Sequence, residues 1–382
     1  MIKSVVALVK CNNYDETLVS DALKRGIALL GGISGMVKPG EKILLKPNLL
    51  SAVEPSRCVT THPSVFKAAA AIFQTAGAKV FYGDSPGFGS IEPHIRKSGL
   101  KAVADELGVI LSDFENGRTV SHKNALQNKQ LFIANGVLET DGLVSLSKMK
   151  THAHTRFTGA VKNQFGCIPG MLKPQYHVKL EDPYQFAKML VDINTFIKPR
   201  LFIMDGIMAM EGNGPSNGKP RAMNVLLFSR DPVALDAVAC KLIDLNPEYV
   251  PTSIPGEKSG LGTYHYENIE VVGDTLEQFI AKDFQVVKRP PEPANLGKLR
   301  GFVRNQTTSR PYIDLAKCTG CGTCIKICPV GAKALAWVNT GENKRPQHNY
   351  KNCIRCYCCQ EMCPEGAITV KTPFLGKLIF RR

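Results

Sequence analysis

A duplicated run of cysteines near the C-terminal end constrains the fold of this chain more than any other feature. The first run begins at Cys318 and reads C-x2-C-x2-C-x3-C-P, and the same run begins again 35 residues later at Cys353. Nine of the 13 cysteines lie between Cys318 and Cys363. The apolar run over residues 5–9 is cut by Lys10 and is too short for a secretion signal, so a disulfide framework is not expected. Cysteines grouped in this way indicate a metal site.

Both runs resemble those of bacterial ferredoxins with two 4Fe-4S clusters, in which the fourth cysteine of each run binds the cluster of the other run. The resemblance therefore implies two 4Fe-4S clusters. It assigns the ligands of one cluster as Cys318, Cys321, Cys324 and Cys363. It assigns those of the other as Cys353, Cys356, Cys359 and Cys328.

Two details of the cysteine region leave alternatives open. A pair of zinc sites is one alternative, although zinc ribbons use two pairs of cysteines and have no use for a third cysteine and a Cys-Pro in each half. Cys358 is an extra thiol beside Cys359, and is either an alternative ligand or an idle neighbour, with the spacing in favour of Cys359. The segment 337–350 is longer than a compact ferredoxin needs, and we expect an extended hairpin there.

A proline-rich stretch, KRPPEP at residues 288–293, divides the chain. We expect a domain over residues 1–287, a linker over 288–305, and a small α+β ferredoxin-type module over 306–382. In the first domain, short apolar runs alternate with helical patterns that open with proline. The predicted strands cover residues 4–9, 42–45, 79–83, 142–146, 201–204, 224–229 and 269–272, and the predicted helices 63–75, 183–197 and 232–243. This order predicts an α/β fold with a mostly parallel sheet and flanking helices.

Polar side chains follow several of the predicted strands. The carboxyl ends of parallel strands open onto one crevice, so we expect a binding or catalytic site there. Lysines suit a carboxylate or phosphate, a histidine can transfer protons near neutral pH, and acidic groups can act as bases or bind a cation. A helix cap for Asp231 and a turn for Asn48 remain the structural alternatives. The candidate catalytic residues are His152, Lys162, Lys150, Asp84 and Asp205, with Lys46, Lys148, His154 and Glu211 beside them.

The order of several short motifs resembles the domain of unknown function 362 family, over about residues 3 to 280. The motifs are KPNL at 46–49, TTHP at 60–63, GDSPG at 83–87, KMKTH at 148–152, KNQFG at 162–166, DG at 205–206 with EGNGP at 211–215, and DPVALD at 231–236. The family name implies no reaction. The glycines of EGNGP indicate a backbone that approaches a ligand closely. No dinucleotide fingerprint or P-loop follows a strand, so neither NAD nor ATP is favoured.

A second resemblance concerns residues 152–170, which look like the His, Gly and Lys segment of the nickel-pincer lactate racemase family. In that family the lysine is the attachment point of the cofactor and the histidine acts on the substrate. This chain lacks the doubled glycine before the lysine and has Asn163 after it. The resemblance implies that His152 and Lys162 share an active site.

The basic charge of the chain is concentrated near the cysteines. The formal net charge is +15, and residues 306–382 hold 12 Lys and Arg against 4 Asp and Glu. Part of this surplus would neutralise the negative clusters, and the rest would suit an acidic redox partner or, through Lys371, Lys377, Arg381 and Arg382, anionic lipid. No motif favours nucleic acid. No apolar run is long enough to span a bilayer, so we expect a cytoplasmic protein without a transmembrane segment.

We favour an iron-sulfur oxidoreductase in which two clusters pass electrons to or from a small anionic substrate, or a partner, at the α/β crevice. About 280 residues with convergent lysine, histidine and aspartate are unnecessary for a simple carrier. Two alternatives stay open. The chain could be a ferredoxin-like electron carrier with a docking domain, or a non-redox enzyme whose clusters are structural.

Overall fold

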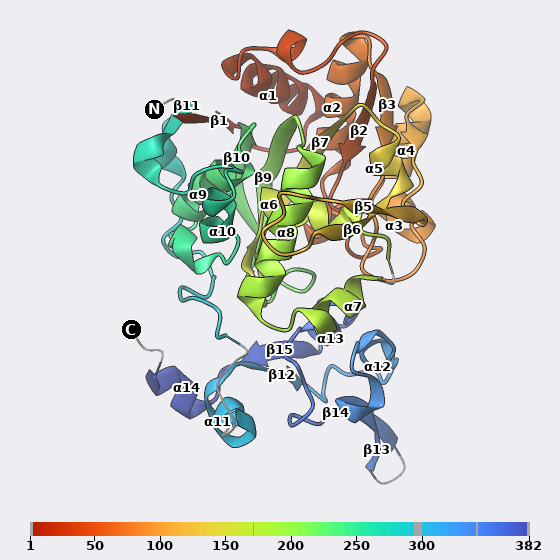
Figure 1. Ribbon diagram of the computed structural model, residues 1–382, viewed down its shortest axis with the longest axis vertical. Coiled ribbons are helices and arrows are strands. Elements are labelled where there is room, and N and C mark those ends of the chain that lie inside the picture. Colours follow the sequence, from red (N-terminus) through yellow and green to blue (C-terminus); the bar gives the residue numbers. More distant parts are fainter. Residues whose placement is uncertain (1–2, 171, 294–299, 341–342, 380–382) are drawn as a thin grey trace.

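The computed structural model describes residues 3–170, 172–293, 300–340 and 343–379. One large sheet with helices on both faces forms the α/β domain, and the C-terminal module lies against one end of it (Figure 1). Among the described residues, no helix has the length and apolar character required to cross a membrane.

The central sheet has nine strands and is mostly parallel, as predicted. Its order is β11-β1-β10-β9-β7-β2-β3-β4, with β8 paired to β7. Strands β9, β7, β2, β3 and β4 run parallel, whereas β10 is antiparallel to both of its neighbours. All seven predicted strands are present. The bounds are β1 Ser4–Lys10, β2 Lys42–Lys46, β3 Lys79–Tyr82, β4 Ile110–Leu111, β7 Gly142–His152, β8 Arg156–Thr158, β9 Leu201–Glu211, β10 Lys219–Ser229 and β11 Ile269–Gly273.

Three strands are much longer than the sequence predicted. We expected strands at 142–146, 201–204 and 224–229, but β7, β9 and β10 each have 11 residues. In β7 and β9, polar residues interrupt the apolar pattern, which is why the predicted strands stopped early. These residues stay in the strands because they are buried and paired, so Lys148 and Asp205 belong to strands and not to the loops after them. In β10 the additional residues precede the predicted start, and most of them are exposed.

Helices cover both faces of the sheet, and alternate strand residues point to opposite sides. In β1, Ala7 and Val9 pack in the core beside α1 and α2, while Val6 and Leu8 pack beside α9. The helices are α1 Glu16–Leu29, α2 Pro63–Thr75, α3 Glu92–Lys97, α4 Leu100–Leu107, α5 Asn135–Leu138, α6 Ala160–Asn163, α7 Leu172–Lys179, α8 Pro183–Ile197, α9 Pro232–Leu242 and α10 Ser253–Lys258. The small hairpin of β5 (Gly117–Ser121) and β6 (Gln130–Ala134) was not predicted.

The three predicted helices that open with proline are confirmed. Asp182 accepts hydrogen bonds from the first turn of α8, and Asp231 does the same for α9. Asp231 is therefore a cap, which is the structural alternative considered for it. At α2 the capping side chain is His62, whose Nδ1 accepts from the Ser64 amide.

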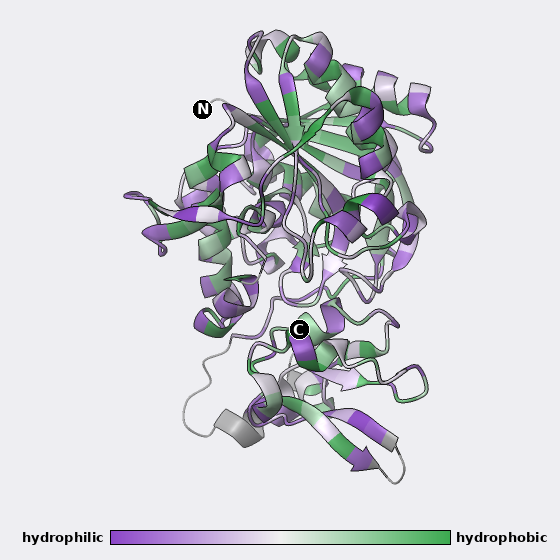
Figure 2. Cartoon of the chain, turned by 90° about the vertical axis from the view of Figure 1, so that its right-hand side faces the viewer, coloured by the Kyte–Doolittle hydropathy of each residue, from purple (hydrophilic) through white to green (hydrophobic). Residues whose placement is uncertain are grey.

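The C-terminal module is a small α+β unit. Strands β12 (Arg310–Ile313) and β15 (Ile368–Lys371) pair antiparallel. The hairpin expected near 337–350 is present as β13 (Leu335–Thr340) and β14 (Asn343–His348), and it projects from the end of the molecule (Figure 2). The helices are α11 Arg300–Thr307, α12 Thr323–Ile327, α13 Cys358–Glu361 and α14 Phe374–Ile379. Helix α11 begins inside the predicted linker 288–305, of which residues 294–299 lie outside the described ranges.

Candidate active site at the domain interface

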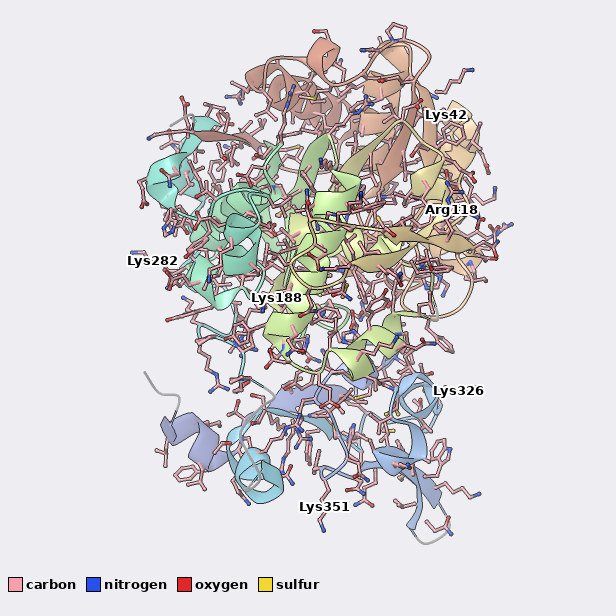
Figure 3. The ribbon with its side chains drawn as sticks, in the orientation of Figure 1. Lys42, Arg118, Lys188, Lys282, Lys326 and Lys351 are labelled. Carbon is pink, nitrogen blue, oxygen red and sulfur yellow. The ribbon has the colours of Figure 1, made fainter. Side chains whose placement is uncertain are left out.

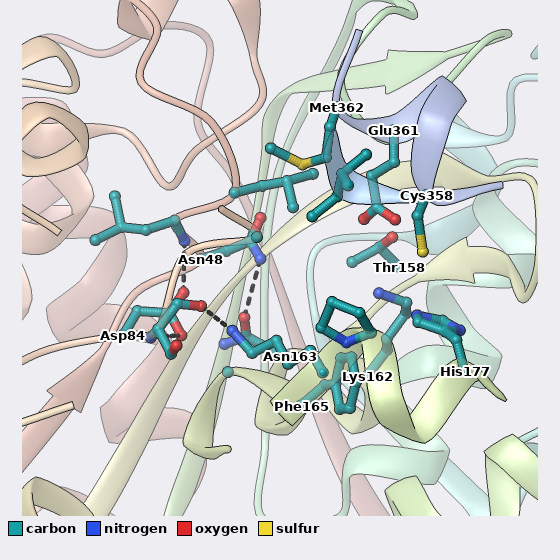
Figure 4. A pocket seen from close by; sticks show the side chains of 18 residues that line it. Asn48, Asp84, Thr158, Lys162, Asn163, Phe165, His177, Cys358, Glu361 and Met362 are labelled. Atoms are coloured by element: carbon teal, nitrogen blue, oxygen red, sulfur yellow. Dashed lines mark hydrogen bonds between the residues drawn. The ribbon is translucent and has the colours of Figure 1, made fainter. Parts of the chain in front are cut away.

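A cavity lies where the module meets the α/β domain, and both contribute to its wall (Figure 4). From the α/β domain come Asp84 after β3, Lys162 on α6, and Lys173 and His177 on α7. The module contributes α13, with Cys358 and Glu361, followed by Met362. Two of the five predicted catalytic residues, Asp84 and Lys162, therefore line a single cavity.

One end of the cavity is closed by a buried ion pair. The Nζ atom of Lys46 lies 2.8 Å from Oδ1 of Asp84, and their side chains are 0% and 3% exposed. The Leu49 amide donates to Oδ2 of Asp84 at 2.7 Å, so the carboxylate is fixed from two sides. Gly166 lets the pair fit, because a Cβ atom there would lie 1.8 Å from Asp84 Oδ1. This pair supports the cavity, with the Lys46 charge already neutralised.

Lys162 is positioned by the start of the short helix α6. Both oxygens of Asp236 accept hydrogen bonds there, from the Ala160 amide at 2.6 Å and the Val161 amide at 3.1 Å. Burial raises the pKa of Asp236 to about 7, although these hydrogen bonds act in the opposite direction. Burial also lowers the pKa of Lys162, which faces the cavity over the Phe165 ring.

Helix α7 contributes two further groups, Lys173 and His177, which are four residues apart and therefore lie on one face of the helix. Lys173 donates to the carbonyl oxygens of Ser85 and Pro86. Burial lowers the pKa of Lys173 to about 7, against the attraction of Asp84. Burial lowers the pKa of His177 to about 4, so its imidazole is neutral at pH 7. Lys162 and Lys173 are thus the cationic groups that can face a bound anion.

Three buried polar atoms on the cavity wall have no hydrogen-bond partner within the described chain: Oδ1 of Asn48, Nδ1 of His177 and Oγ1 of Thr158. His177 and Thr158 are 6% and 3% exposed. A buried polar group without a partner costs about 1 to 3 kcal/mol, and a polar ligand or water would remove that cost. The cavity therefore has the features of a binding site for a small polar molecule.

His152 lies beside this cavity but does not line it. Its Nδ1 accepts from the amides of His154 and Thr155, and its Nε2 lies 3.7 Å from Oε1 of Glu361, which is too long for a hydrogen bond. Burial and the positive charge of Lys162 lower the pKa of His152 to about 4. Burial opposes ionisation of Glu361, yet the surrounding basic groups hold its pKa well below the usual range. Because His152 is neutral, we attribute the charge stabilisation of Glu361 to Lys162.

The remaining candidates lie away from the cavity. Lys150 donates to the Val59 carbonyl at 2.7 Å, and burial lowers its pKa to about 7. Asp205 is bound to Lys148 at 2.8 Å and to the hydroxyl of Tyr14 at 2.8 Å inside the sheet. Glu211 accepts from the Gln285 amide, and His154 lies among aromatic rings. Neither Lys150 nor Asp205 reaches the cavity.

The glycine-rich segment at residues 211–215 docks the module. Nε2 of Gln360 donates to the backbone and side-chain oxygens of Asn213, at 3.0 and 2.9 Å, and to the Gly214 carbonyl at 3.2 Å. Asn217 donates to the carbonyls of Gln360 and Cys363. Gly214 is required because a Cβ would lie 2.3 Å from the Thr151 carbonyl. Gly214 thus allows a close approach of the backbone to Thr151.

The cysteines fall into two spatial groups. Cys318, Cys321, Cys324 and Cys363 line one pocket of the module. Burial, together with the charges of the other three thiols, raises the pKa of Cys324 to about 11. Four thiols around one hollow fit a 4Fe-4S cluster. Among the described residues, no three His, Cys, Asp or Glu side chains converge closely enough to share a single metal ion.

The other four cysteines also approach one another. Burial raises the pKa of Cys359 and Cys328, and nearby Cys353 and Cys356 raise both further. Nε2 of His348 lies 3.4 Å from the sulfur of Cys359, where it can donate to a thiolate. Cys359 and Cys328 thus lie near Cys353 and Cys356, and the assignment of these four cysteines to one cluster stays a prediction. When bound, each cluster would supply one-electron redox chemistry.

Several lining residues were missed in the sequence: Thr158, Lys173, His177 and Glu361. The spacing of Lys173 and His177 is a helical signal, but α7 follows no strand and so escaped the crevice argument. Glu361 lies between two predicted cluster ligands, where nothing in the pattern shows which way it points. Only the docking of the module turns Glu361 toward the cavity.

Two solved structures are distantly similar to the chain. The lactate racemase apoprotein from Thermoanaerobacterium thermosaccharolyticum is 14% identical, with a TM-score of 0.41 over 63% of this chain and 56% of the other. A structural-genomics protein from Thermotoga maritima is 14% identical, with a TM-score of 0.36 over 61% and 60%. The chain spans less than two thirds of the length of each.

Comparison of sequences is more informative. The chain is 38% identical over 262 residues to the thylakoid-associated protein sll1697 of Synechocystis sp., covering 68% of this chain and 81% of that protein. Residues 310–364 match the 4Fe-4S dicluster domain, and residues 43–241 match the domain of unknown function DUF362. The chain therefore belongs to the DUF362 family and carries an iron-sulfur cluster-binding domain at its C-terminal end.

Proposed function

We propose that this protein is an iron-sulfur oxidoreductase in which two 4Fe-4S clusters exchange electrons with a small anionic substrate in the interdomain cavity. The single observation that carries the proposal is the composition of the cavity wall. Lys162 and Lys173 line the cavity together with Cys358, the direct neighbour of the proposed cluster ligand Cys359. A substrate in this cavity would touch the loop that holds a cluster.

The chemistry of the wall favours a carboxylate or phosphate. Lys162 and Lys173 face a bound anion, while Thr158 and His177 offer polar atoms that lack partners. Electron transfer to a small anion is usually coupled to proton uptake. Lys173 can hold a proton for transfer at neutral pH, because its pKa is about 7. His152 would act through Glu361 and not by contact with the substrate.

We propose that electrons enter or leave at the surface of the module around Cys321. Cys321 is the exposed member of its group of four cysteines, and Lys317 and Lys326 are exposed close to it in sequence. This surface suits an acidic redox partner, because complementary charges steer the encounter of two proteins. The same exposure also favours the second candidate function, an electron carrier whose α/β domain only docks.

The test is an anaerobic assay on the full chain. The protein is first analysed for iron and sulfide, with about eight of each per chain expected for two clusters. It is then reduced, and its cluster absorbance is followed while small carboxylates and phosphate esters are added. We expect a substrate to reoxidise the wild-type protein. Lys162→Ala should abolish this reoxidation and His152→Ala should weaken it, while the exposed control Lys188→Ala should behave as wild type.

The alternatives give different results in the same assay. A carrier would donate electrons to an external acceptor protein equally well after Lys162→Ala and His152→Ala. A non-redox enzyme would convert its substrate while the clusters stay in one oxidation state. Iron for fewer than two clusters would contradict the assignment of eight ligands.

We also propose that the protein is cytoplasmic and touches a membrane surface through α14. Phe374 on this helix is 73% exposed, and Leu375 and Leu378 are exposed beside it. Lys371 and Lys377 supply positive charge that suits anionic lipid. Arg381 and Arg382, which the sequence assigned to the same surface, lie outside the described residues. The name of the thylakoid-associated relative agrees with a peripheral contact.

A further inference from the structure

A second cleft lies in the α/β domain, and all of its described lining residues belong to that domain. Its volume is about 630 Å³, within the range of small-molecule sites, about 300 to 1,000 Å³. The wall comes from the loop between β5 and β6, the end of α8, the starts of β9 and α9, and the residues after α10. Phe202 lies at the start of β9, whereas the module contacts Asn213 and Asn217 beyond the end of that strand. The cleft and the interdomain cavity are therefore at opposite ends of the parallel strands.

The charged side chains on the wall of this cleft are basic. Lys123, Lys198 and Arg230 line it, and no Asp or Glu is among its described lining residues. Within the part of the chain that the structure describes, these three side chains form no ion pair or hydrogen bond. Elsewhere in the domain an exposed lysine can be paired, as Lys101 is with Asp105. Like charges around one cleft repel each other, so a bound anion would stabilise the arrangement.

The loop that carries Lys123 is held in place by a buried carboxylate. Asp192 on α8 is 0% exposed, and it accepts hydrogen bonds from the amides of residues 126–128 at 2.6, 3.1 and 2.7 Å. A second contact joins Nε2 of His122 to Oγ1 of Thr195 at 2.9 Å. Two separate contacts thus fix the loop against α8, and the cleft is formed before a ligand arrives, as is usual for small-molecule sites.

The cleft also has apolar walls. Phe202 is 1% exposed, and Pro232 at the start of α9 is buried. The ring of Phe196 is partly buried and meets the ring of His122 edge to face, with centroids 5.8 Å apart. A flat apolar group can pack on such a ring while an anion attached to it reaches the cations. The wall therefore combines two kinds of contact that a single small molecule can make.

We propose that this cleft is a second binding site, which takes a soluble organic phosphate that carries a flat apolar ring. The phosphate binds Lys123, Lys198 and Arg230 through charge-assisted hydrogen bonds, and the ring packs on Phe196. A phosphate monoester suits three cations better than a carboxylate does, because it has a charge of about −1.5 to −2 at pH 7 and three acceptor oxygens. The site uses neither the clusters nor the interdomain cavity, so it stands independently of the proposed function.

The site is tested by hydrogen exchange of the full chain in the presence of phenyl phosphate. The ligand should slow exchange in residues 121–128 and 193–198, and the concentration that gives half of this protection measures the affinity. Inorganic phosphate and phenol, the two halves of the probe, should each bind at least tenfold more weakly. The same protection should appear in Lys162→Ala, which separates this site from the interdomain cavity. Phosphatidic acid vesicles should give no protection here.

Variants test the two kinds of contact separately. Lys123→Ala combined with Lys198→Ala should weaken binding of phenyl phosphate at least tenfold. Lys129→Ala, which removes an exposed lysine of the same loop that does not line the cleft, is the matched control and should bind as the wild type does. Phe196→Leu keeps an apolar side chain without the ring, and should reduce the preference for phenyl phosphate over inorganic phosphate.

Each contrary result overturns a stated part of the proposal. Unchanged exchange in residues 121–128 and 193–198 would overturn the site itself. Equal binding of phenyl phosphate and inorganic phosphate would overturn the apolar contact, and equal affinity in the double variant and the wild type would overturn the cationic contact. Loss of protection in Lys162→Ala would assign the binding to the interdomain cavity instead, and protection by vesicles would replace the soluble ligand by a lipid headgroup.

Discussion

At the scale of single residues, the buried pair of Lys46 and Asp84 supports the cavity. The carboxylate accepts from Lys46 and from the Leu49 amide, in a place where Gly166 leaves just enough room. Removing one partner of a buried ion pair leaves an uncompensated charge away from water, which costs about 3 to 5 kcal/mol. The first prediction follows from this cost.

We predict that Asp84→Asn lowers the free energy of unfolding by about 3 kcal/mol, because Lys46 keeps its charge and loses its partner. Anaerobic urea unfolding followed by circular dichroism measures the change. The matched control is Asp105→Asn, which breaks an exposed pair with Lys101 and should cost less than about 0.5 kcal/mol. A change below 1 kcal/mol in Asp84→Asn would show that the pair does not support the fold.

The lowered pKa of Lys173 predicts that anion binding depends on pH. Burial lowers its pKa to about 7, against the attraction of Asp84 and together with repulsion from Lys46 and Lys162. The nearby His94 and Cys167 also face it. The ammonium form predominates below the pKa, so affinity for an anion should be highest below about pH 7 and should fall as the pH rises through that value.

Calorimetric titration with acetate between pH 6 and 9 measures this dependence, because acetate keeps its charge over that range. We expect Lys173→Arg to bind acetate with nearly constant affinity, since a guanidinium does not titrate there. Above the pKa of Lys173, the affinity of the wild-type protein for acetate should fall by at most about tenfold for each pH unit. The same pH profile in Lys173→Arg and wild type would assign the titration to another group.

At the scale of elements, the docking of the module depends on α13 and the segment after β9. Gln360 on α13 donates to Asn213 and Gly214, and Asn217 donates back to the module. These contacts hold Cys358 and Glu361 against the cavity. The cavity is therefore a property of two elements that are about 150 residues apart in sequence.

We predict that Gln360→Ala loosens this docking by about 1 to 3 kcal/mol, because the oxygens of Asn213 and Gly214 lose their donor. Hydrogen exchange should increase in residues 211–217 and in α13 while the cluster absorbance stays the same. Gln347→Ala, on the exposed face of β14, is the control and should leave exchange at both places unchanged. Unchanged exchange in Gln360→Ala would mean that other contacts hold the module.

At the scale of the whole molecule, basic side chains are spread over the surface of both the α/β domain and the module, as Lys42, Arg118, Lys188, Lys282, Lys326 and Lys351 show (Figure 3). The surplus charge of the chain is therefore not confined to the cysteines. On α14, positive charge is combined with exposed apolar side chains, which is the combination that binds anionic membranes.

We predict that Phe374→Ser combined with Leu378→Ser lowers binding to phosphatidylglycerol vesicles at least tenfold. Transfer of a Phe or Leu side chain out of water contributes about 1.5 to 3 kcal/mol to the free energy of binding. Loss of both side chains should therefore weaken binding more than tenfold. Cosedimentation with vesicles measures the change, and phosphatidylcholine vesicles test the contribution of charge. The control is Leu315→Ser, an exposed leucine elsewhere on the module. Equal binding by the double variant and wild type would contradict a lipid contact of α14.

The sequence by itself determined the local features of this protein. Residues 63–75, 183–197 and 232–243 form helices because proline opens each one and a side chain caps it. The two cysteine runs predict two sets of four cluster ligands, because the spacing of cysteines in a cluster-binding loop is a local property of the sequence. The α/β order of elements follows from periodicity, which depends on neighbours along the chain.

The tertiary structure alone decided which polar residues meet. Lys150, Asp205 and Lys162 look equivalent in sequence, but the first two are bound inside the sheet and only Lys162 lines the cavity. Strands β7 and β9 run on past their apolar parts because buried pairing partners come from distant strands. Glu361 and Cys358 reach the cavity only because the module docks on residues 211–217. Sequence patterns report local preference, whereas burial and pairing depend on contacts between distant segments.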